Sequence, residues 1–338
     1  MKRQVHFGII STAAIAKEVM IPAIRRTSHA EVVAIASENG KANQVARELG
    51  IPKAYDSYEK LLDDRDVDAV YIPLPNSLHV EWTIKAAKKK KHVLCEKPAA
   101  LCEEDVRRMI GGCEENGVLF MEAFMYQFHP QHERVKQLLA AGEIGEVKYM
   151  RTHFSFYLQD RETNIRMNDE LGGGSLLDVG CYCVHSTRHI LDAEPVELFV
   201  QSRFDPHRSV DLTTSGWMRI ENGVFAQFMC SFDMFPQNEY EVIGTKGKII
   251  VSRAYRPDVD SGEGRITIVT ADGSEREETV AGDQYALQIE HFSRAILEGT
   301  PLLYSPERMI KQARALDACR TSMKTGAIVQ LYKEGESR

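Results

Sequence analysis

The chain has 338 residues, of which 43% are hydrophobic and 27% charged, and its formal net charge is −7. This size suits a globular protein with two domains, and its interspersed charges exclude the basic surface that nucleic acid requires. No apolar run approaches the roughly 20 residues of a membrane-spanning helix, so we expect neither nucleic acid nor a membrane as a partner.

The first part of the chain alternates strand-like and helix-like segments with short connections. The predicted strands are Val5–Ile10, Glu31–Ala36, Ala69–Pro73, His92–Glu96 and Val118–Ala123. The predicted helices between and after them are Ile15–Thr27, Lys41–Leu49, Ser77–Lys90 and Asp105–Asn116. This alternation implies right-handed crossovers and a parallel sheet, so we predict an α/β domain over residues 1–123.

The second part, residues 124–338, has a different pattern. Turn residues such as Glu221-Asn222-Gly223 separate segments that alternate in polarity, as antiparallel strands require. The predicted strands are Val147–Tyr157, Val196–Phe204, Leu212–Ile220, Val224–Phe232, Lys248–Ser252 and Arg265–Thr270, and the predicted helices are Arg134–Ala141, Tyr285–Leu297 and Pro306–Thr321. We predict an α+β domain with a large, mainly antiparallel open sheet.

The turn after the first predicted strand lies where a dinucleotide-binding fold has its G-x-G-x-x-G/A motif. The frame falls on Ser11-Thr12-Ala13-Ala14-Ile15-Ala16, so small residues replace all three glycines. Ala16 is an accepted third residue, and Ser11 or Thr12 can offer a hydroxyl beside the amides of the helix N-terminus. An ordinary strand-to-helix turn is an equally good interpretation of this loop alone.

Two later strand ends point to the same edge of the predicted sheet. One strand leads into Pro73-Leu74-Pro75-Asn76, and the next ends at Cys95-Glu96-Lys97-Pro98. Ligands of open α/β sheets bind at the carboxyl ends of the strands. Asn76 is also a good N-cap for the following helix, but a lysine before a rigid proline is an unusual packing choice. We therefore expect Lys97 to have a functional role.

A third group of polar residues follows a run of three glycines in the second domain. Asp178, Tyr182, His185 and His189 share one face of the helix predicted to start at Ser175. Ser175 and Asp178 also match a capping box, and the other side chains equally suit a solvated helix face. The seven cysteines include no CxxC pair, so we expect no zinc or other metal here and a reducing, cytoplasmic location.

These motifs together resemble the family of glucose–fructose oxidoreductase, inositol dehydrogenase and the rhizopine-catabolism proteins. The resemblance rests on Glu96-Lys97-Pro98, on Pro73-x-Pro75-Asn76-x-x-His79, and on Asn164-Ile165-Arg166 with the run from Leu171 to Cys183. That run and Glu122–Tyr126 are similar to the branch of D-xylose 1-dehydrogenases and trans-dihydrodiol dehydrogenases. The resemblance implies a Rossmann domain binding NAD(P) over 1–123 and a substrate-binding and oligomerisation domain over 124–338.

The resemblance also implies which residues form the site. Lys97, Asp178 and Tyr182 are the implied catalytic residues for hydride transfer to or from a sugar, polyol or diol. The implied cofactor-binding residues are Ser11, Thr12, Ala13, Ile15, Ser37, Glu38, Lys41, Pro73, Leu74, Asn76, His79, Glu96 and Lys97. The implied substrate contacts are Tyr126, His153, Asn164, Arg166 and His185. Relatives in this family pair through the open sheet, which implies a homodimer or homotetramer.

The residues after the second strand, Ser37-Glu38-Asn39-Gly40-Lys41, bear on the choice between NAD and NADP. Glu38 would repel the 2′-phosphate of NADP, whereas Ser37 leaves room for it and Lys41 could reach it; we favour NAD. The alternatives are a trans-dihydrodiol dehydrogenase, a dicarbonyl reductase, a cofactor-bound sensor without turnover, and a dehydratase or glycosidase that uses the cofactor transiently. Whether Lys97 or Tyr182 is the base stays open, and we favour Tyr182.

Overall fold

The computed structural model describes residues 4–331, which form two compact units. The first unit holds the described residues up to 125 together with 285–313, and the second holds 126–284 together with the described residues from 314. The division at 125 lies close to the expected boundary at 123, but residues 285–313 return to the first unit. A single domain boundary cannot describe this arrangement, because a helix that follows most of the second unit in the sequence packs into the core of the first unit.

The first unit contains a parallel sheet of six strands in the order β3-β2-β1-β4-β5-β6 within the described residues. Its strands are β1 (Val5–Ile10), β2 (Ala30–Ala36), β3 (Lys53–Tyr55), β4 (Ala69–Ile72), β5 (His92–Cys95) and β6 (Phe120–Glu122). The strands other than the edge strand β3 are mostly buried, because parallel crossovers place helices on both faces of the sheet. This strand order is that of the dinucleotide-binding Rossmann fold, which confirms the predicted fold class.

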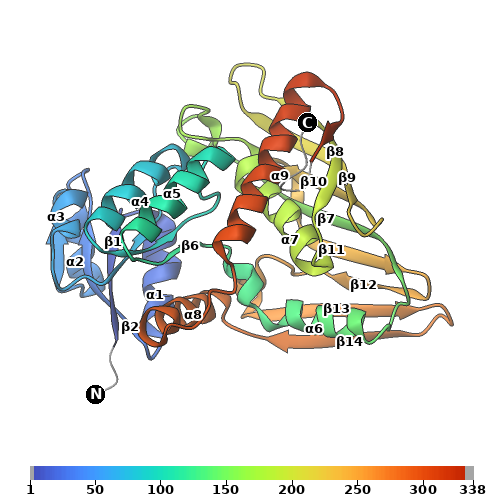
Figure 1. Cartoon of the computed structure of the whole chain (residues 1–338), viewed down its shortest axis with the longest axis horizontal. Coiled ribbons are helices and arrows are strands. Elements are labelled where there is room, and N and C mark those ends of the chain that lie inside the picture. The colour runs from blue at the N-terminus through green and yellow to red at the C-terminus, as the bar shows by residue number, and fades with distance from the viewer. Residues whose placement is uncertain (1–3, 332–338) are drawn as a thin grey trace. The chain divides into compact units, whose positions relative to one another are not determined.

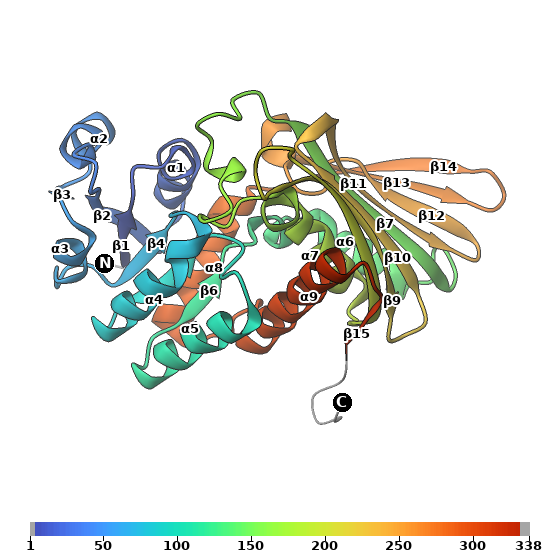
Figure 2. The same ribbon diagram turned by 90° about the horizontal axis from the view of Figure 1, so that it is seen from above.

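Helical segments connect these strands. They are η1 (Ala16–Met20), α1 (Ile21–Arg25), α2 (Ala42–Leu49), α3 (Tyr58–Leu62), η2 (Asn76–Leu78), α4 (His79–Lys88) and α5 (Glu103–Glu115). Helices α4 and α5 lie side by side in both ribbon views (Figures 1 and 2). The later helix α8 (Gln284–Glu298) adds Phe292 to this core, where its ring lies 6.3 Å from that of Phe7.

The second unit contains a sheet of nine strands in the order β14-β13-β12-β11-β7-β10-β9-β8-β15 within the described residues. Its strands are β7 (Val147–Tyr157), β8 (Pro195–Phe204), β9 (Asp211–Ile220), β10 (Phe225–Ser231), β11 (Asp233–Gly244), β12 (Gly247–Val251), β13 (Glu263–Thr270), β14 (Glu275–Ala281) and β15 (Val329–Gln330). Strands β7 and β10 pair in parallel, and the other strand pairs of this sheet within the described residues are antiparallel. The predicted large, mainly antiparallel sheet is therefore confirmed.

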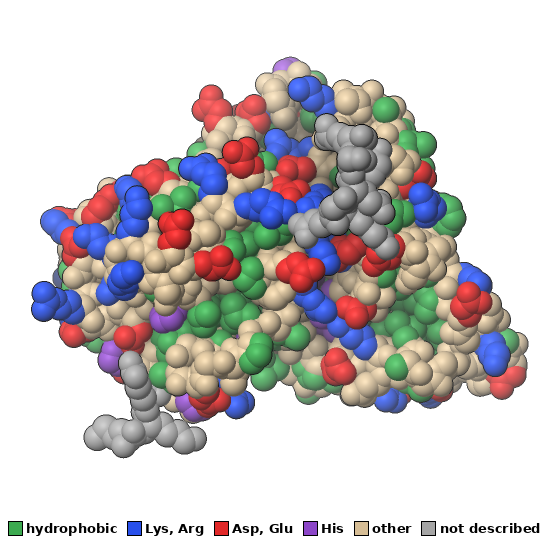
Figure 3. Space-filling view, viewed as in Figure 1, with side chains coloured by type: hydrophobic (Ala, Val, Ile, Leu, Met, Phe, Trp, Pro, Cys, Tyr) green, Lys and Arg blue, Asp and Glu red, His purple; other side chains and the backbone are tan. Residues whose placement is uncertain are grey.

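Helical segments accompany these strands, and the last of them begins in the first unit and ends in the second. They are η3 (Met125–Phe128), α6 (Pro130–Ala140), η4 (Ile165–Met167), η5 (Leu176–Gly180), α7 (Cys181–Leu191), η6 (Pro257–Asp260) and α9 (Pro306–Thr325). The pair η5–α7 packs on β7 and β10, and α6 runs along β13 and β14 (Figure 1). On the visible face of the molecule, basic and acidic side chains are interspersed (Figure 3). No helix within residues 4–331 is long and apolar enough to span a membrane.

Candidate active site

Ser11 closes the turn between β1 and the first helix. Its φ of 133° lies in the region that favours glycine, as expected where the motif has its first glycine. Its amide donates to Ala36 O at 3.1 Å, and its hydroxyl accepts from the Ala13 amide at 2.9 Å. Ser11 therefore adopts the tight turn that a glycine would adopt, and the hydrogen bond that its hydroxyl accepts from the Ala13 amide stabilises this conformation.

The end of β2 meets this turn through side chains. The Ser37 hydroxyl is only 2% exposed; it lies 3.5 Å from Thr12 Oγ1 and donates to the side chain of Asn39. Asn39 Oδ1 in turn accepts from the Lys41 amide at 3.2 Å. Glu38, in contrast, is exposed. The buried Ser37 hydroxyl fixes the loop through these bonds, and the exposed side chains of Glu38 and Lys41 are the charges at this position.

The loop that carries Lys97 is held by two neighbouring strands, β4 and β6. The Glu96 amide donates to Ile72 O at 3.1 Å at the end of β4, and the Ala99 amide donates to Glu122 Oε1 at 2.8 Å. The peptide between Lys97 and Pro98 is cis. Glu122 is only 2% exposed, so this charged side chain is committed to the loop. Sequence analysis did not assign Glu122; its signal is a carboxylate at the buried end of a strand.

Two of the residues expected to bind the cofactor, His79 and Glu96, also form hydrogen bonds within the protein. His79 is fully buried, with Nε2 2.8 Å from Leu74 O and Nδ1 3.0 Å from Pro98 O, so it joins the two strand-end loops. Burial lowers its pKa despite these two carbonyl acceptors. Glu96 accepts a hydrogen bond from the buried Tyr71 hydroxyl at 2.5 Å.

The interpretation of Asn76 as the N-cap of the following helix is wrong. Asn76 is the first residue of the short η2 turn, and Leu78 is the residue that precedes α4.

A dinucleotide fits this edge of the first unit. The loops after β1, β2, β4 and β5 all leave the carboxyl ends of parallel strands, and β1 and β4 are neighbours where the strand order reverses. The helix after Ser11 starts at residue 14, so amides of its first turn face the same edge. The expected residues that lie on these four loops or in the first turn of the helical segment that follows are Ser11, Thr12, Ala13, Ile15, Ser37, Glu38, Lys41, Pro73, Leu74, Asn76, Glu96 and Lys97.

In the second unit, Asp178 forms an ion pair with Arg166. Its Oδ2 lies 2.6 Å from Arg166 Nε, and the carboxylate raises the pKa of Arg166. Asn164 caps the η4 turn, with Oδ1 accepting from the Arg166 amide at 3.1 Å. The capping-box interpretation of Ser175 and Asp178 is wrong, because Ser175 has another partner.

That partner is Asp211, which sequence analysis missed. Its buried Oδ2 accepts from the Ser175 hydroxyl at 2.6 Å and from the Leu176 amide at 2.7 Å, which caps η5 from across the unit. Gly174 has a φ of 108°, and a Cβ there would lie 2.2 Å from Asp211 Oδ1. The glycine run is thus needed for close approach of the helix start to β9.

Tyr182 lies one turn after Asp178 and is only 5% exposed. Its ring centroid is 5.4 Å from that of Phe154 and 5.8 Å from that of Tyr126. Tyr126 Oη lies 2.5 Å from His185 Nδ1, and the rings of His185 and His189 stack at 5.7 Å. The structure therefore brings together Tyr126, Tyr182 and His185, and it pairs Arg166 with Asp178 close enough to Tyr182 for Tyr182 to contribute to the raised pKa of Arg166. Within residues 4–331 no cluster of ligating side chains could hold a metal ion.

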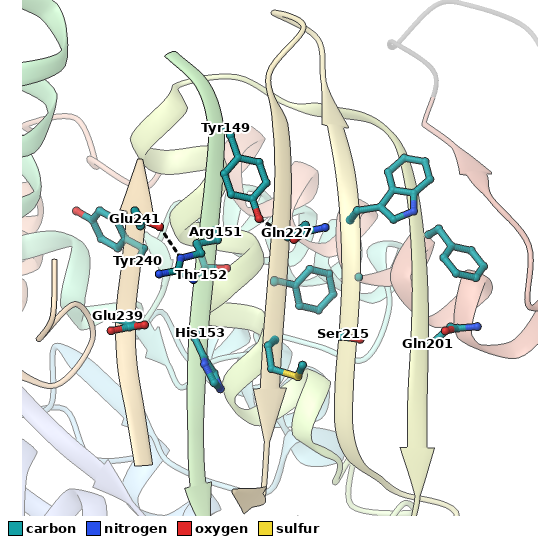
Figure 4. A pocket seen from close by; sticks show the side chains of 15 residues that line it. Tyr149, Arg151, Thr152, His153, Gln201, Ser215, Gln227, Glu239, Tyr240 and Glu241 are labelled. Atoms are coloured by element: carbon teal, nitrogen blue, oxygen red, sulfur yellow. Dashed lines mark hydrogen bonds and ion pairs between the residues drawn. The ribbon is translucent and has the colours of Figure 1, made fainter. Parts of the chain in front are cut away.

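His153 does not join this group. Successive side chains of a strand point to opposite faces, and Phe154 is the residue of β7 that contacts Tyr182. His153 lines a hollow of about 540 Å³ on the other face, together with Tyr149 and Arg151. Figure 4 shows that this hollow lies across neighbouring strands. Within it, Arg151 Nε forms an ion pair with Glu241 Oε2 at 2.6 Å. We therefore leave His153 out of the substrate site proposed below.

Profiles of two protein families match most of the chain. The oxidoreductase family with an NAD-binding Rossmann fold matches residues 5–124, and the GFO/IDH/MocA C-terminal domain matches residues 132–250. A D-xylose 1-dehydrogenase (NADP(+)) of Haloferax volcanii is 40% identical over 96% of this chain and 99% of its own length. The chain belongs to the GFO/IDH/MocA family.

Two further members of the GFO/IDH/MocA family support this assignment. A trans-1,2-dihydrobenzene-1,2-diol dehydrogenase of Xenopus laevis is 33% identical over 72% of this chain and 74% of its own length. A solved 3-ketoreductase of Actinomadura kijaniata, in complex with NADP and TDP-benzene, is 32% identical with a TM-score of 0.89, over 95% of this chain and 98% of that one. The chain is accordingly an NAD(P)-dependent oxidoreductase with a cofactor-binding Rossmann domain, which excludes the sensor alternative.

Proposed function

We propose that this protein oxidises the C1 hydroxyl of a pentose such as D-xylose, with the nicotinamide cofactor as the hydride acceptor. The observation that carries the proposal is the 40% identity to a D-xylose 1-dehydrogenase along almost the entire length of both chains. The Rossmann unit supports cofactor binding, and the helix pair η5–α7 supplies Asp178 and Tyr182.

The proposed chemistry assigns a separate task to each side chain. The bound nicotinamide supplies the hydride acceptor. Tyr182 acts as the phenolate: its Oη takes the proton of the reacting hydroxyl and becomes the neutral phenol, and the Lys97 ammonium stabilises the negative charge that develops on the substrate oxygen. Asp178, paired with Arg166, accepts a hydrogen bond from a neighbouring sugar hydroxyl, and Arg166 and Asn164 extend this polar surface. The clamped Lys97 loop supports this role because it limits the movement of the lysine.

We further propose that NAD is the preferred cofactor. The exposed carboxylate of Glu38 follows Ser37 at the end of β2, where it accepts the ribose hydroxyls of NAD and repels a 2′-phosphate. The D-xylose 1-dehydrogenase relative is named for NADP(+), so this protein would differ from it. Replacing Glu38→Arg would raise kcat/KM for NADP relative to NAD by at least about tenfold.

A panel of aldoses, polyols, trans-diols and dicarbonyls with NAD and with NADP tests these proposals. Formation or loss of reduced nicotinamide gives kcat/KM for each pair. Oxidation of D-xylose at least tenfold faster than of the diols is the expected result. Preference for a trans-diol would favour the alternative supported by the Xenopus relative, and product formed without net reduced cofactor would indicate a dehydratase or glycosidase. No turnover of any sugar would contradict the proposal.

We also propose that a second copy of the chain covers the open face of the nine-stranded sheet. Phe199, Trp217 and Met229 line the hollow there beside the Arg151–Glu241 pair, and Phe225, whose ring centroid lies 6.4 Å from that of Trp217, is 52% exposed. An apolar surface of this kind on a sheet is typical of an interface. Analytical ultracentrifugation would show a homodimer or homotetramer, and Trp217→Glu would shift the mass towards the monomer; a monomeric parent protein would contradict the proposal.

A further inference from the structure

Three aromatic rings surround that of Tyr182, and we call them the Tyr182 cage: Tyr126, Phe154 and Tyr255. Their centroids lie 5.8, 5.4 and 5.6 Å from the centroid of Tyr182. The cage rings also pack on one another, with Phe154 stacked on Tyr255 at 5.0 Å and Tyr126 at 5.3 Å from Tyr255. Close packing on several sides leaves the Tyr182 side chain few rotamers.

Two members of the cage are tied to the helix that carries Tyr182. Tyr126 Oη bonds to His185 Nδ1 at 2.5 Å, and Tyr255 Oη bonds to Ser186 Oγ at 2.9 Å. His185 and Ser186 come three and four residues after Tyr182 on α7, which places them one turn along the same face. The cage and the helix therefore move as one body unless these bonds break.

The hydroxyls of this arrangement are enclosed by protein. Tyr126 and Tyr255 are fully buried, His185 is 2% exposed and Ser186 is fully buried. Burial raises the pKa of both cage tyrosines well above the usual value, so their phenols stay neutral. Groups enclosed in this way are poorly placed to contact a sugar, which differs from the sequence-based expectation that Tyr126 and His185 bind substrate.

We infer that Tyr126, Tyr255 and His185 are positioning residues, which fix the direction of the Tyr182 hydroxyl and do not bind the sugar. This inference rests on the proposed role of Tyr182 as the base. A misplacement of a reacting group by about 1 Å costs on the order of 100-fold in rate. Loss of either tether therefore lowers the rate of the chemical step while leaving the binding of the sugar intact.

The test compares Tyr126→Phe and Tyr255→Phe, each made in the parent chain and in Tyr182→Phe. These changes keep the rings and remove one hydroxyl each. With D-xylose, or the sugar oxidised fastest in the panel, we expect kcat to fall at least about tenfold and KM to change less than about threefold. In the Tyr182→Phe background we expect no further loss, because the group being positioned is already absent.

Tyr240→Phe is the matched control. Its buried hydroxyl bonds to His132 Nδ1 at 2.9 Å, so the change also removes one buried tyrosine–histidine bond, but this bond is to α6 and not to the helix that carries Tyr182. The His132 ring packs on Tyr126 with 5.0 Å between centroids, and the variant keeps this contact. Its thermal midpoint shows what such a loss costs in stability, and its kcat stays within about threefold of the parent value.

Three outcomes would overturn the inference while the proposed function stands. The cage variants could keep the parent kcat while Tyr182→Phe loses at least about 100-fold. They could instead raise KM at unchanged kcat, which would make the hydroxyls sugar contacts. They could also lose as much in the Tyr182→Phe background, which would mean a general structural effect. A loss under tenfold in Tyr182→Phe itself would refute the proposed base and the inference together.

Discussion

Ser11 is a serine in a backbone conformation that L-residues rarely adopt, with φ at 133°. Such a conformation costs about 1–3 kcal/mol in a non-glycine residue, and the surroundings must offset it. Here the hydroxyl accepts from the Ala13 amide at 2.9 Å, which a glycine could not do. The altered motif thus exchanges backbone freedom for one side-chain bond.

This exchange predicts an order of stability among variants of Ser11. Ser11→Ala keeps the strain and loses the bond, so it should lower the free energy of unfolding by about 1 kcal/mol. Ser11→Gly also loses the bond but relieves the strain, so it should be more stable than Ser11→Ala. Urea unfolding of both variants measures the difference. An alanine variant as stable as the glycine variant would show that the turn is not strained.

The sequence predicted residues of the site that lie in contiguous motifs, but it did not predict hydrogen-bond partners that are distant in the chain. Lys97, Asp178 and Tyr182 were indicated by motifs that are contiguous in the chain. The partner of Asp178 is Arg166, and the partner of Ser175 is Asp211, which is 36 residues away. A capping box assumes that the nearest suitable carboxylate is used, and that assumption fails when a strand brings another one closer.

At the scale of elements, alternation of polarity was a good guide where strands are regular. The predicted strand Val147–Tyr157 has the bounds of β7. Strand β11 was missed because Pro236 interrupts its pattern and its register with β7 shifts between Asp233 and Gln237. Strand β14 was missed because its sequence, EREETVA, is charged, as suits an exposed edge strand.

The start of η5 depends on Asp211, which predicts a large effect of its removal. Its carboxylate accepts from Ser175, the Leu176 amide and, at 2.6 Å, Thr214. Asp211→Ala should lower the free energy of unfolding by about 3 kcal/mol, because three buried donors lose their partner. The measurement is chemical denaturation followed by circular dichroism.

Asp272 provides a matched control for this prediction. Its exposed carboxylate also accepts three bonds, from Thr270 Oγ1 and from the amide and hydroxyl of Ser274 in the β13–β14 turn. Water can replace these partners, so Asp272→Ala should cost less than about 1 kcal/mol. Equal losses in the two variants would contradict the capping role assigned to Asp211.

At the scale of the whole molecule, buried histidines link stability to pH. Burial lowers the pKa of His79, His92, His129 and His132 below the ordinary value. The unfolded chain therefore binds protons that the folded chain does not, and this holds in both units. Stability is fully present above the unfolded histidine pKa of about 6.5 and is lost as the pH falls below it.

This linkage predicts a lower thermal midpoint at pH 5.5 than at pH 7.5. The carboxylates with lowered pKa, such as Asp64 and Asp233, lose their contribution only near or below pH 4, so the histidines account for this window. His132→Gln, which removes one titrating group, should give a shallower dependence. A midpoint that is constant or rises between pH 7.5 and 5.5 would contradict the assignment.

Transfer of hydride from a sugar carbon to nicotinamide is the central claim, and D-xylose with deuterium at C1 tests it most directly. With NAD and the parent enzyme, the deuterium should appear on the reduced nicotinamide, and both Lys97→Met and Tyr182→Phe should lower kcat/KM at least about 100-fold. Reduced cofactor without the label, or losses under tenfold in both variants, would contradict it.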